Sequence, residues 1–418
     1  MRFCFITQWF PPEQAPIGHM MLELARNMVR RGHHVTVITG FPNHPEGRVF
    51  GGYSKRLILK EEIHGVQVWR VWLATSTKRT KMNRMLTFFS FTVSLSIAFL
   101  FLIKCDVVFA VLQPLSVGPF LSAACWMKRT KLVLNVQDLH PDVPIELGLI
   151  RNPFMVDFLR RIERFSYRHC HAVTTICDGF RNHICSKGTT KGSVYVIPNW
   201  IDTEAVRPQC RLTLFRKELG LDEEHIVCLF AGTVGYVSGA DIILDAAEQL
   251  RTMKHVCFVF VGEGPIVPQL KENVAKRGLS NVLFRGFQSR ERLSDVQSTS
   301  DISLVTLKKG KGMHSVPSKV LGYMAAGRPV IASVDEGSET ARQIRSADCG
   351  LVARPGDVDA LADAIKSLAV DNAECDRLGG NGRIYVEHEL AMDQVLERYT
   401  KTLEGIATDG TKSCQSPS

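Results

Sequence analysis

Side chains that could hold a negatively charged ligand gather in residues 316–333, which read VPSKVLGYMAAGRPVIAS. Pro317 and Ser318 indicate the start of a short helix, and Lys319 adds a full positive charge there. The first N–H groups of a helix have no partner within the helix and carry partial positive charge, so they stabilise phosphate groups. This composition predicts a site for a diphosphate.

Glycines in three loops could bring further backbone N–H groups close to such a ligand. The loops are the first turn of the chain, with Gly18, the stretch GTVG ending at Gly235, and the stretch GEG ending at Gly264. The first turn lacks the G-x-G-x-x-G fingerprint of dehydrogenases, and no G-x-x-x-x-G-K-[ST] phosphate loop occurs in the chain. We therefore expect phosphate binding by a different kind of site.

A second group of polar residues lies in QDLHPD, where a predicted strand ends. Asp138 and His140 could contact a bound substrate, or they could form a turn closed by an Asx hydrogen bond before Pro141. Glu339 starts another predicted helix, where helix capping and ligand binding are both compatible with its position.

Metal binding is not expected from the acidic or the cysteine-containing segments. Asp357 and Asp359 form a D-x-D sequence, but it follows RPG at a predicted helix start, which favours N-capping. A cluster of histidines and cysteines fits none of the common zinc spacings, and we interpret the thiols as free in a reducing cytoplasm. Its members are His169, Cys170, His171, Cys177, His183 and Cys185.

The length and composition are those of a folded soluble enzyme with two domains. The chain has 418 residues, of which 45% are hydrophobic and 22% are charged. The 51 Lys+Arg and 42 Asp+Glu give a net charge of +9, which is compatible with an anionic ligand or a membrane surface. No long basic run or aromatic–basic patch predicts nucleic-acid binding. The first ten residues lack the features of a signal peptide, so we expect them to form the first strand.

Strands alternate with helices in both halves, which predicts an α/β fold with two doubly wound, Rossmann-like domains. Ligands of such sheets bind at the carboxyl ends of the strands. We expect a first domain over 1–204, a second domain over 205–390, a helix over 391–408 that packs back on the first domain, and a disordered tail over 409–418. The predicted strands cover 2–7, 34–39, 66–73, 105–111, 130–136, 171–176, 193–198, 226–234, 256–264, 281–287, 301–307 and 350–355, and a further buried strand is predicted within 314–333 after a loop and a short helix.

Residues 85–103 form an uncharged apolar run that is long enough to cross a membrane. The run lies between two strands of the predicted sheet, where a crossover helix is needed, and a true span would place those strands on opposite sides of a bilayer. A buried crossover helix and a helix partly embedded in a membrane surface both remain open. The charged neighbours of the run are Lys78, Arg79, Lys81, Arg84 and Lys104.

A basic amphipathic segment over 151–168 is relevant to the same question. Its apolar residues recur at helical spacing among four arginines, which suits an anionic membrane interface and equally a solvated basic face on a core helix. The residues concerned are Phe154, Phe158, Ile162 and Phe165, with Arg160, Arg161, Arg164 and Arg168.

The order of these motifs resembles that of the retaining glycosyltransferases of family 4, which have the GT-B fold of two facing Rossmann-like domains with a cleft between them. The resemblance runs from residue 1 to about residue 405 and is nearest to the branch that builds bacterial O-antigen, capsule and exopolysaccharide repeat units. It rests on FPPE, ELARNMVRRGHHVTVITGFPNHPEG, QDLHPD, VIPNWIDTEAVRP, FVGEGP, VLFRGF and VPSKVLGYMAAGRPVIAS followed by SETARQI.

The resemblance implies transfer of a sugar from a nucleotide diphosphate donor on the second domain to a glycan acceptor, linked to polyprenyl diphosphate, on the first domain. Such enzymes usually need no metal or cofactor, so positive groups must stabilise the departing diphosphate. It further implies a role in lipopolysaccharide or capsule synthesis. With the apolar and basic segments, we expect a cytoplasmic protein held peripherally at the inner face of the membrane through 78–104 and 151–168.

Carried over to this sequence, the resemblance makes Lys319 the first catalytic candidate, with Asp138 and His140 as the others. The same carry-over makes Phe287 a candidate for reading the base. The candidates for donor binding are Gly18, Gly235, Gly264, Phe287, His314, Ser318, Lys319 and Glu339.

The chain also departs from the family pattern. Many members carry two glutamates eight residues apart around this helix, and here those positions hold His314 and Gly322. The loop GTVGYVSGAD has no basic residue, so the diphosphate would depend more on Lys319, with Lys308, Lys309 or Lys311 as possible additions. A nucleotide-sugar epimerase of GT-B architecture and a non-catalytic nucleotide-sugar binding protein are the alternatives, which product analysis would separate.

Overall fold

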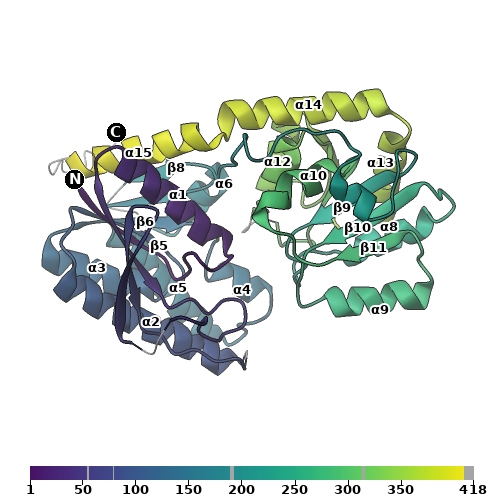
Figure 1. The fold of residues 1–418 in the computed structure, drawn as a ribbon. Helices are drawn as coiled ribbons and strands as arrows, with labels where there is room; N and C mark the ends of the chain where they lie inside the picture. Colours follow the sequence, from purple (N-terminus) through teal and green to yellow (C-terminus); the bar gives the residue numbers. More distant parts are fainter. Residues whose placement is uncertain (54–55, 79, 189–192, 313–315, 409–418) are drawn as a thin grey trace. The chain divides into compact units, whose positions relative to one another are not determined.

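A computed structural model describes residues 1–53, 56–78, 80–188, 193–312 and 316–408. The chain forms two compact units, Met1–Pro198 together with the C-terminal segment from Leu396, and Asn199–Val395. Each unit contains one main sheet with helices on both faces (Figure 1). The predicted α/β class with two Rossmann-like sheets is confirmed.

The sheet of the first unit has the order β3-β4-β2-β1-β5-β6-β7-β8. Its strands are parallel except for β3, which pairs antiparallel with β4. The sequence prediction did not include β3. Its strands are β1 (Arg2–Ile6), β2 (His34–Gly40), β3 (Ile58–Ile63), β4 (Val66–Val71), β5 (Val107–Val111), β6 (Lys131–Val136), β7 (Ala172–Thr175) and β8 (Ser193–Val196).

Helices cover both faces of this sheet. Because parallel crossovers are right-handed, α1 lies on one face, and the helices that follow β4, β5, β6 and β7 lie on the other. The last helix packs on the first unit, where Asn135 donates a hydrogen bond to the Tyr399 hydroxyl at 3.2 Å. The helices are α1 (Pro16–Arg30), α2 (Lys81–Leu102), α3 (Val117–Lys128), α4 (Asp142–Glu146), α5 (Pro153–Arg168), α6 (Asp178–Ser186) and α15 (Met392–Thr408).

The apolar run forms α2, which is the crossover between β4 and β5. Both strands belong to the same sheet, so the interpretation in which they lie on opposite sides of a bilayer is wrong. By length and composition alone, Met82–Leu102 could still cross a membrane, with a mean hydropathy of 2.1. Only 33% of that stretch is buried inside the protein, so α2 is not the fully buried crossover helix either.

The second unit contains a fully parallel sheet with the order β11-β10-β9-β12-β13-β14. Its strands are β9 (Ile226–Ala231), β10 (Val256–Val261), β11 (Val282–Arg285), β12 (Ile302–Thr306), β13 (Val330–Ser333) and β14 (Gly350–Ala353). Its helices are α7 (Leu214–Glu218), α8 (Asp241–Gln249), α9 (Val267–Arg277), α10 (Leu293–Ser298), α11 (Lys319–Ala325), α12 (Glu339–Ala347), α13 (Val358–Ala369) and α14 (Asn372–Glu389), with the 3-10 turn η1 (Arg290–Arg292).

Two apolar layers hold this second sheet, one on each face. Along β9, Val227 and Leu229 belong to the layer packed against α11, whereas Cys228 and Phe230 belong to the layer packed against α8 and α13. This alternation follows from the two-residue period of a strand, and both sets are apolar because both faces are covered. The strand ends are therefore fixed, and they hold their loops in defined places.

Candidate functional site

Lys319 lies at the topological switch point of the second sheet. The strands β9 and β12 are neighbours, and the chain continues from β9 to β10 on one side and from β12 to β13 on the other. Ligands of open α/β sheets bind where the loops diverge in this way. Lys319 follows β12 as the first residue of α11, and its Nζ lies 3.4 Å from the ring centroid of Phe230 on β9.

The ammonium group of Lys319 has no anionic partner in the described part of the chain. Burial lowers its pKa from the ordinary 10.5 to about 7, and no carboxylate acts in the opposite direction. The face of the Phe230 ring offers only the weaker attraction of a cation–π contact. A buried charge without a partner is unfavourable, so an anionic ligand would supply what the protein itself lacks.

Glycines let the loops after β9 and β10 pack backbone against backbone beside Lys319. A Cβ at Gly264 would lie 2.1 Å from the carbonyl oxygen of Val234, and a Cβ at Gly262 would lie 2.2 Å from that of Gly232. The N–H of Val234 donates to the carbonyl of Glu263 at 2.9 Å. No larger residue fits at either position without movement of the backbone.

Gly235 differs from these packing glycines. Nothing in the described residues lies within 4 Å of the position of a Cβ at Gly235. The next residues return to the sheet, where Thr306 donates to the carbonyl of Ser238 at 2.6 Å. Gly235 therefore lies in the open part of a loop that is anchored at both ends, where a ligand could approach its backbone.

The other predicted donor-binding residues lie on loops at the same carboxyl edge of this sheet. Phe287 follows β11 and is 60% exposed, so its ring is free to stack on a base. Ser318 is exposed at the N-cap of α11. Glu339 forms an ion pair with Arg342, while Ser338 caps α12 by accepting from the N–H of Ala341 at 3.2 Å. The prediction for His314 falls outside the described residues.

Asp138 and His140 lie together after β6 in the first unit. The N–H of His140 donates to the carbonyl of Asp138 at 3.0 Å, so the segment is a tight turn. Burial lowers the pKa of His140, the charge of Asp138 opposes this, and Arg84 of α2 adds to the lowering. A neutral imidazole can accept a proton from a hydroxyl, which is the chemistry expected of a base near an acceptor.

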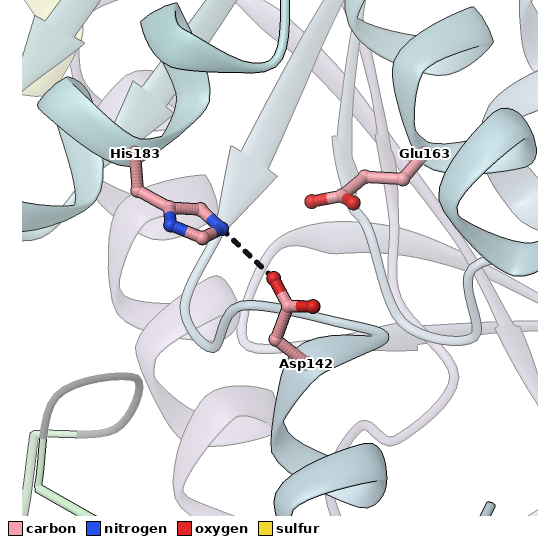
Figure 2. Close-up of side chains that lie close together, drawn as sticks. All are labelled: Asp142, Glu163 and His183. Carbon is pink, nitrogen blue, oxygen red and sulfur yellow. Dashed lines mark hydrogen bonds and ion pairs between the residues drawn. The ribbon is translucent and has the colours of Figure 1, made fainter. Parts of the chain in front are cut away.

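A buried charge cluster holds the turn that carries these two residues. Asp142, the first residue of α4, lies 2.9 Å from Nε2 of His183, and Figure 2 shows Glu163 of α5 pointing toward the same pair. Lys187 donates to Asp142 and to both oxygens of Glu163, at 2.8 and 3.1 Å for the latter. Tyr167 donates to Glu163 at 3.2 Å. The cluster thus ties α4 to α5 and α6.

The pKa shifts in this cluster follow from its contacts. Burial opposes ionisation of Asp142, but hydrogen bonds and charges from His183 and Lys187 lower its pKa well below the usual range. Burial raises the pKa of Glu163, and Lys187 offsets only part of that effect. Oxygen and nitrogen atoms of Asp142, Glu163 and His183 lie within 4.8 Å of one another, as metal ligands would. The ammonium group of Lys187 contacts both carboxylates and so supplies the positive charge that a metal ion would supply there.

Two family models match the chain, one on each unit. The model described as glycosyl transferase 4-like domain matches residues 17–200, and the model described as glycosyl transferases group 1 matches residues 213–385. The putative colanic acid biosynthesis glycosyl transferase WcaI of Escherichia coli K12 is 26% identical over 95% of this chain and 98% of its own length. The chain belongs to the glycosyltransferases, with a 4-like first domain and a group 1 second domain.

Solved structures of this kind share the fold. Sucrose-phosphate synthase from Thermosynechococcus elongatus has a TM-score of 0.77 at 15% identity, covering 98% of this chain and 100% of its own. The HepE protein of Anabaena, solved in complex with UDP-glucose, has a TM-score of 0.73 at 16% identity, covering 97% and 100%. The predicted resemblance and the GT-B fold are confirmed.

This glycosyltransferase fills the place of one missing family glutamate with another side chain. A Cβ at Gly322 would lie 3.1 Å from Nε2 of Gln297 on α10. Gln297 is 3% exposed, and its Oε1 has no hydrogen-bond partner among the described residues. A glutamate at position 322 would therefore require Gln297 to move. The glycine that replaces the family glutamate thus packs against Gln297, a contact that could not be seen in the sequence.

Close packing requires a glycine at position 18 and at position 264, and the predicted roles in donor binding did not include this requirement. A Cβ at Gly18 would lie 2.8 Å from the carbonyl oxygen of Trp9, so this glycine lets α1 pack on the loop after β1. Glu13 holds the same loop by accepting from the N–H groups of Asn43 and His44, both at 2.9 Å. Gly18 could be singled out from its position beside the first predicted helix. No local sequence pattern indicated that Glu13 holds the loop.

Proposed function

We propose that this glycosyltransferase is a retaining enzyme that transfers a sugar from a nucleotide diphosphate donor to a glycan acceptor. The donor is assigned to the second unit and the acceptor to the first. The observation that carries the proposal is Lys319, a half-buried lysine at a sheet switch point whose only described charge contact is the Phe230 ring. A diphosphate has the charge that this group lacks, and the neighbouring open loop at Gly235 offers it backbone N–H groups.

In the proposed reaction, the bond between the anomeric carbon and the donor diphosphate breaks, and a bond to an acceptor oxygen forms. Lys319 stabilises the negative charge that grows on the departing diphosphate, so that no metal takes part. The acceptor hydroxyl loses its proton during the transfer. His140, with its lowered pKa, and Asp138 are the groups we assign to the acceptor side. Phe287 is assigned to the base, because its ring is exposed next to the strand end.

The acceptor we propose is a glycan linked to polyprenyl diphosphate, used in the synthesis of a cell-surface polysaccharide such as lipopolysaccharide or capsule. The similarity to a protein named for colanic acid biosynthesis supports this class of product. A lipid-linked acceptor requires an enzyme at a membrane. We therefore propose a cytoplasmic protein bound peripherally to the inner face of the membrane.

A donor panel tests the proposal directly. UDP-, GDP- and dTDP-sugars are added to the purified protein, and thermal shift and release of nucleoside diphosphate are measured. We expect one nucleotide sugar to stabilise the protein and to be slowly hydrolysed. Lys319→Met should reduce turnover about 100- to 1000-fold, as loss of one group that stabilises a developing charge does.

The control is Lys217→Met, which removes an exposed lysine of α7 in the same unit. It should leave both donor binding and turnover unchanged. Because Lys319 forms no ion pair with any residue that the structure describes, Lys319→Met should unfold at the same temperature as the wild type or above it. Wild-type turnover by Lys319→Met would remove Lys319 from the mechanism, and binding without turnover in the presence of lipid-linked acceptors would indicate a binding protein.

A further inference from the structure

The exposed side of helix α2 is largely apolar, and its buried side holds hydroxyl groups among apolar residues such as Phe91, Leu95 and Phe99. Thr92 is 0% exposed and lies 2.8 Å from the hydroxyl of Ser116, and Ser96 is 7% exposed and donates to the carbonyl of Thr92. A helix at the surface of a soluble protein instead exposes mainly polar side chains. The exposed apolar side chains of α2 recur at helical spacing, and they are Met82, Met85, Leu86, Phe89, Ile97, Phe101 and Leu102.

The neighbouring helices α3 and α5 extend this apolar surface. The three helices lie on the same face of the first sheet, and α3 packs between α2 and α5. Close contact between α3 and α5 depends on Gly118, where a Cβ would meet the Ser166 hydroxyl. The exposed apolar residues on these two helices are Phe120, Trp126 and Met127 of α3 and Phe154, Met155, Phe158 and Phe165 of α5. Together with the exposed residues of α2, they form what we name the α2–α3–α5 face.

Positive charges accompany the apolar side chains on this face. On α5, the side chains of Arg160, Arg161 and Arg164 are 50%, 73% and 43% exposed. Arg160 pairs with Asp142, and Arg161 and Arg164 share Asp157, so these three arginines exceed their acidic partners by one charge. Lys104 and Arg129, which follow α2 and α3, are exposed as well. A second copy of the chain would bring like charges together across such a face, whereas the headgroups of anionic lipids would neutralise them.

We propose that the α2–α3–α5 face is a membrane-binding surface, in which the aromatic side chains enter the interface of a bilayer and the arginines contact anionic headgroups. Aromatic and apolar side chains with adjacent basic residues are the composition of helices that lie in the plane of a membrane interface. This inference rests on the proposed lipid-linked acceptor, because it places the protein where that acceptor is found.

Hydrogen bonds within the first unit hold both ends of α2. Lys128 of α3 donates to the carbonyl groups of Phe99 and Leu100 at 2.8 and 3.0 Å, and also to that of Ile103. At the other end, the Thr80 hydroxyl accepts from the N–H of Asn83 at 3.2 Å. Both ends are thus closed by protein groups, so we expect α2 to lie along the bilayer surface with its buried face on the sheet.

Vesicle flotation with the full chain tests the surface. We expect the protein to float with vesicles of phosphatidylglycerol and phosphatidylcholine, to float less with pure phosphatidylcholine, and to lose binding as salt rises. Phe89→Ser/Phe101→Ser/Trp126→Ser should weaken partitioning about a hundredfold, because each removes apolar surface from the bilayer. Arg161→Glu/Arg164→Glu should weaken it at least about tenfold, since each basic residue near an anionic surface contributes roughly fivefold.

Matched controls come from the second unit. Val370→Ser/Ile384→Ser removes two apolar side chains that are 78% and 56% exposed, and Arg251→Glu/Lys254→Glu reverses two exposed charges. Both should float like the wild type. Equal binding by the surface variants and these controls would overturn the proposal. Self-association that the triple serine variant abolishes, with no binding to vesicles, would assign the face to a second copy instead.

Donor binding separates this inference from the proposed function. The surface variants should keep the thermal shift given by the nucleotide sugar, which also shows that they are folded. A wild-type protein that hydrolyses a nucleotide sugar but ignores every vesicle would refute the surface and the proposed membrane location, and would leave the proposed sugar transfer standing. A protein that floats but responds to no nucleotide sugar would refute the proposed function and leave the surface standing.

Discussion

Lys187 in the first unit and Lys319 in the second are both withdrawn from solvent, but their surroundings differ. Lys187 donates to two buried carboxylates, which receive further hydrogen bonds from His183 and Tyr167. Among the described residues, the ammonium group of Lys319 contacts only the face of the Phe230 ring. The first lysine completes a charge cluster and holds elements together, whereas the second keeps its charge available. A lysine shielded from solvent therefore indicates a binding site only when no carboxylate of the protein already neutralises its charge.

The largest effect that this comparison predicts is on the stability of the first unit. Lys187→Met would leave Glu163 buried without its cation, and breaking a buried ion pair in this way costs about 3–5 kcal/mol of unfolding free energy. Urea unfolding measures the change. The partner variant Lys187→Met/Glu163→Gln should recover part of the loss, because it also removes the unpaired charge. If Lys187→Met is as stable as the wild type, the cluster does not hold α4, α5 and α6 together.

The glycines around Lys319 give a smaller contrast within the second unit. Gly264→Ala would place a Cβ against the carbonyl of Val234, so we expect a loss of about 1–3 kcal/mol of stability together with weaker donor binding. Gly235→Ala meets open space and should stay within about 0.5 kcal/mol of the wild type. Thermal and urea unfolding of both variants provides the comparison. An equally small effect at Gly264 would mean that the two loops adapt to the added methyl group.

Local sequence patterns were enough to predict most of the fold. Apolar strands between amphipathic helices gave both parallel sheets, because in such sheets each strand is buried on both faces. The strand β3 was missed, although His64 and Gly65 form a two-residue turn with φ angles of 50° and 82°, which is typical of a hairpin. Its mixture of charged and apolar residues is typical of an edge strand, whereas the pattern that predicted the other strands is that of a strand buried on both faces.

The candidate site could be predicted only where its residues are close in sequence. Lys319, Ser318 and the glycine loops lie beside strand ends, and these positions follow from the topology. The cluster of Asp142, Glu163, His183 and Lys187 joins three helices, so no local spacing could show that Lys187 faces two carboxylates. The packing of Gln297 against Gly322 depends on how α10 and α11 meet, which the sequence does not specify either.

Proton uptake on donor binding tests the central claim about Lys319 most directly. Its lowered pKa means that at pH 8 most of this lysine is neutral in the folded protein, while in the unfolded chain it is charged. The stability of the free protein should therefore rise with pH from about 7 to 10.5, where only the unfolded state binds the proton. A bound diphosphate favours the charged lysine, so the affinity should fall as pH rises above about 7.

The measurement is calorimetric titration of a nucleotide sugar at pH 8, in two buffers with different ionisation enthalpies. A nucleotide sugar is preferred to a free nucleoside diphosphate, because both of its phosphates are esterified and do not titrate in this range. We expect an uptake of about one proton per bound ligand by the wild type and none by Lys319→Met. Tight binding by the wild type without any proton uptake would contradict the account in which a neutral Lys319 becomes charged against the diphosphate.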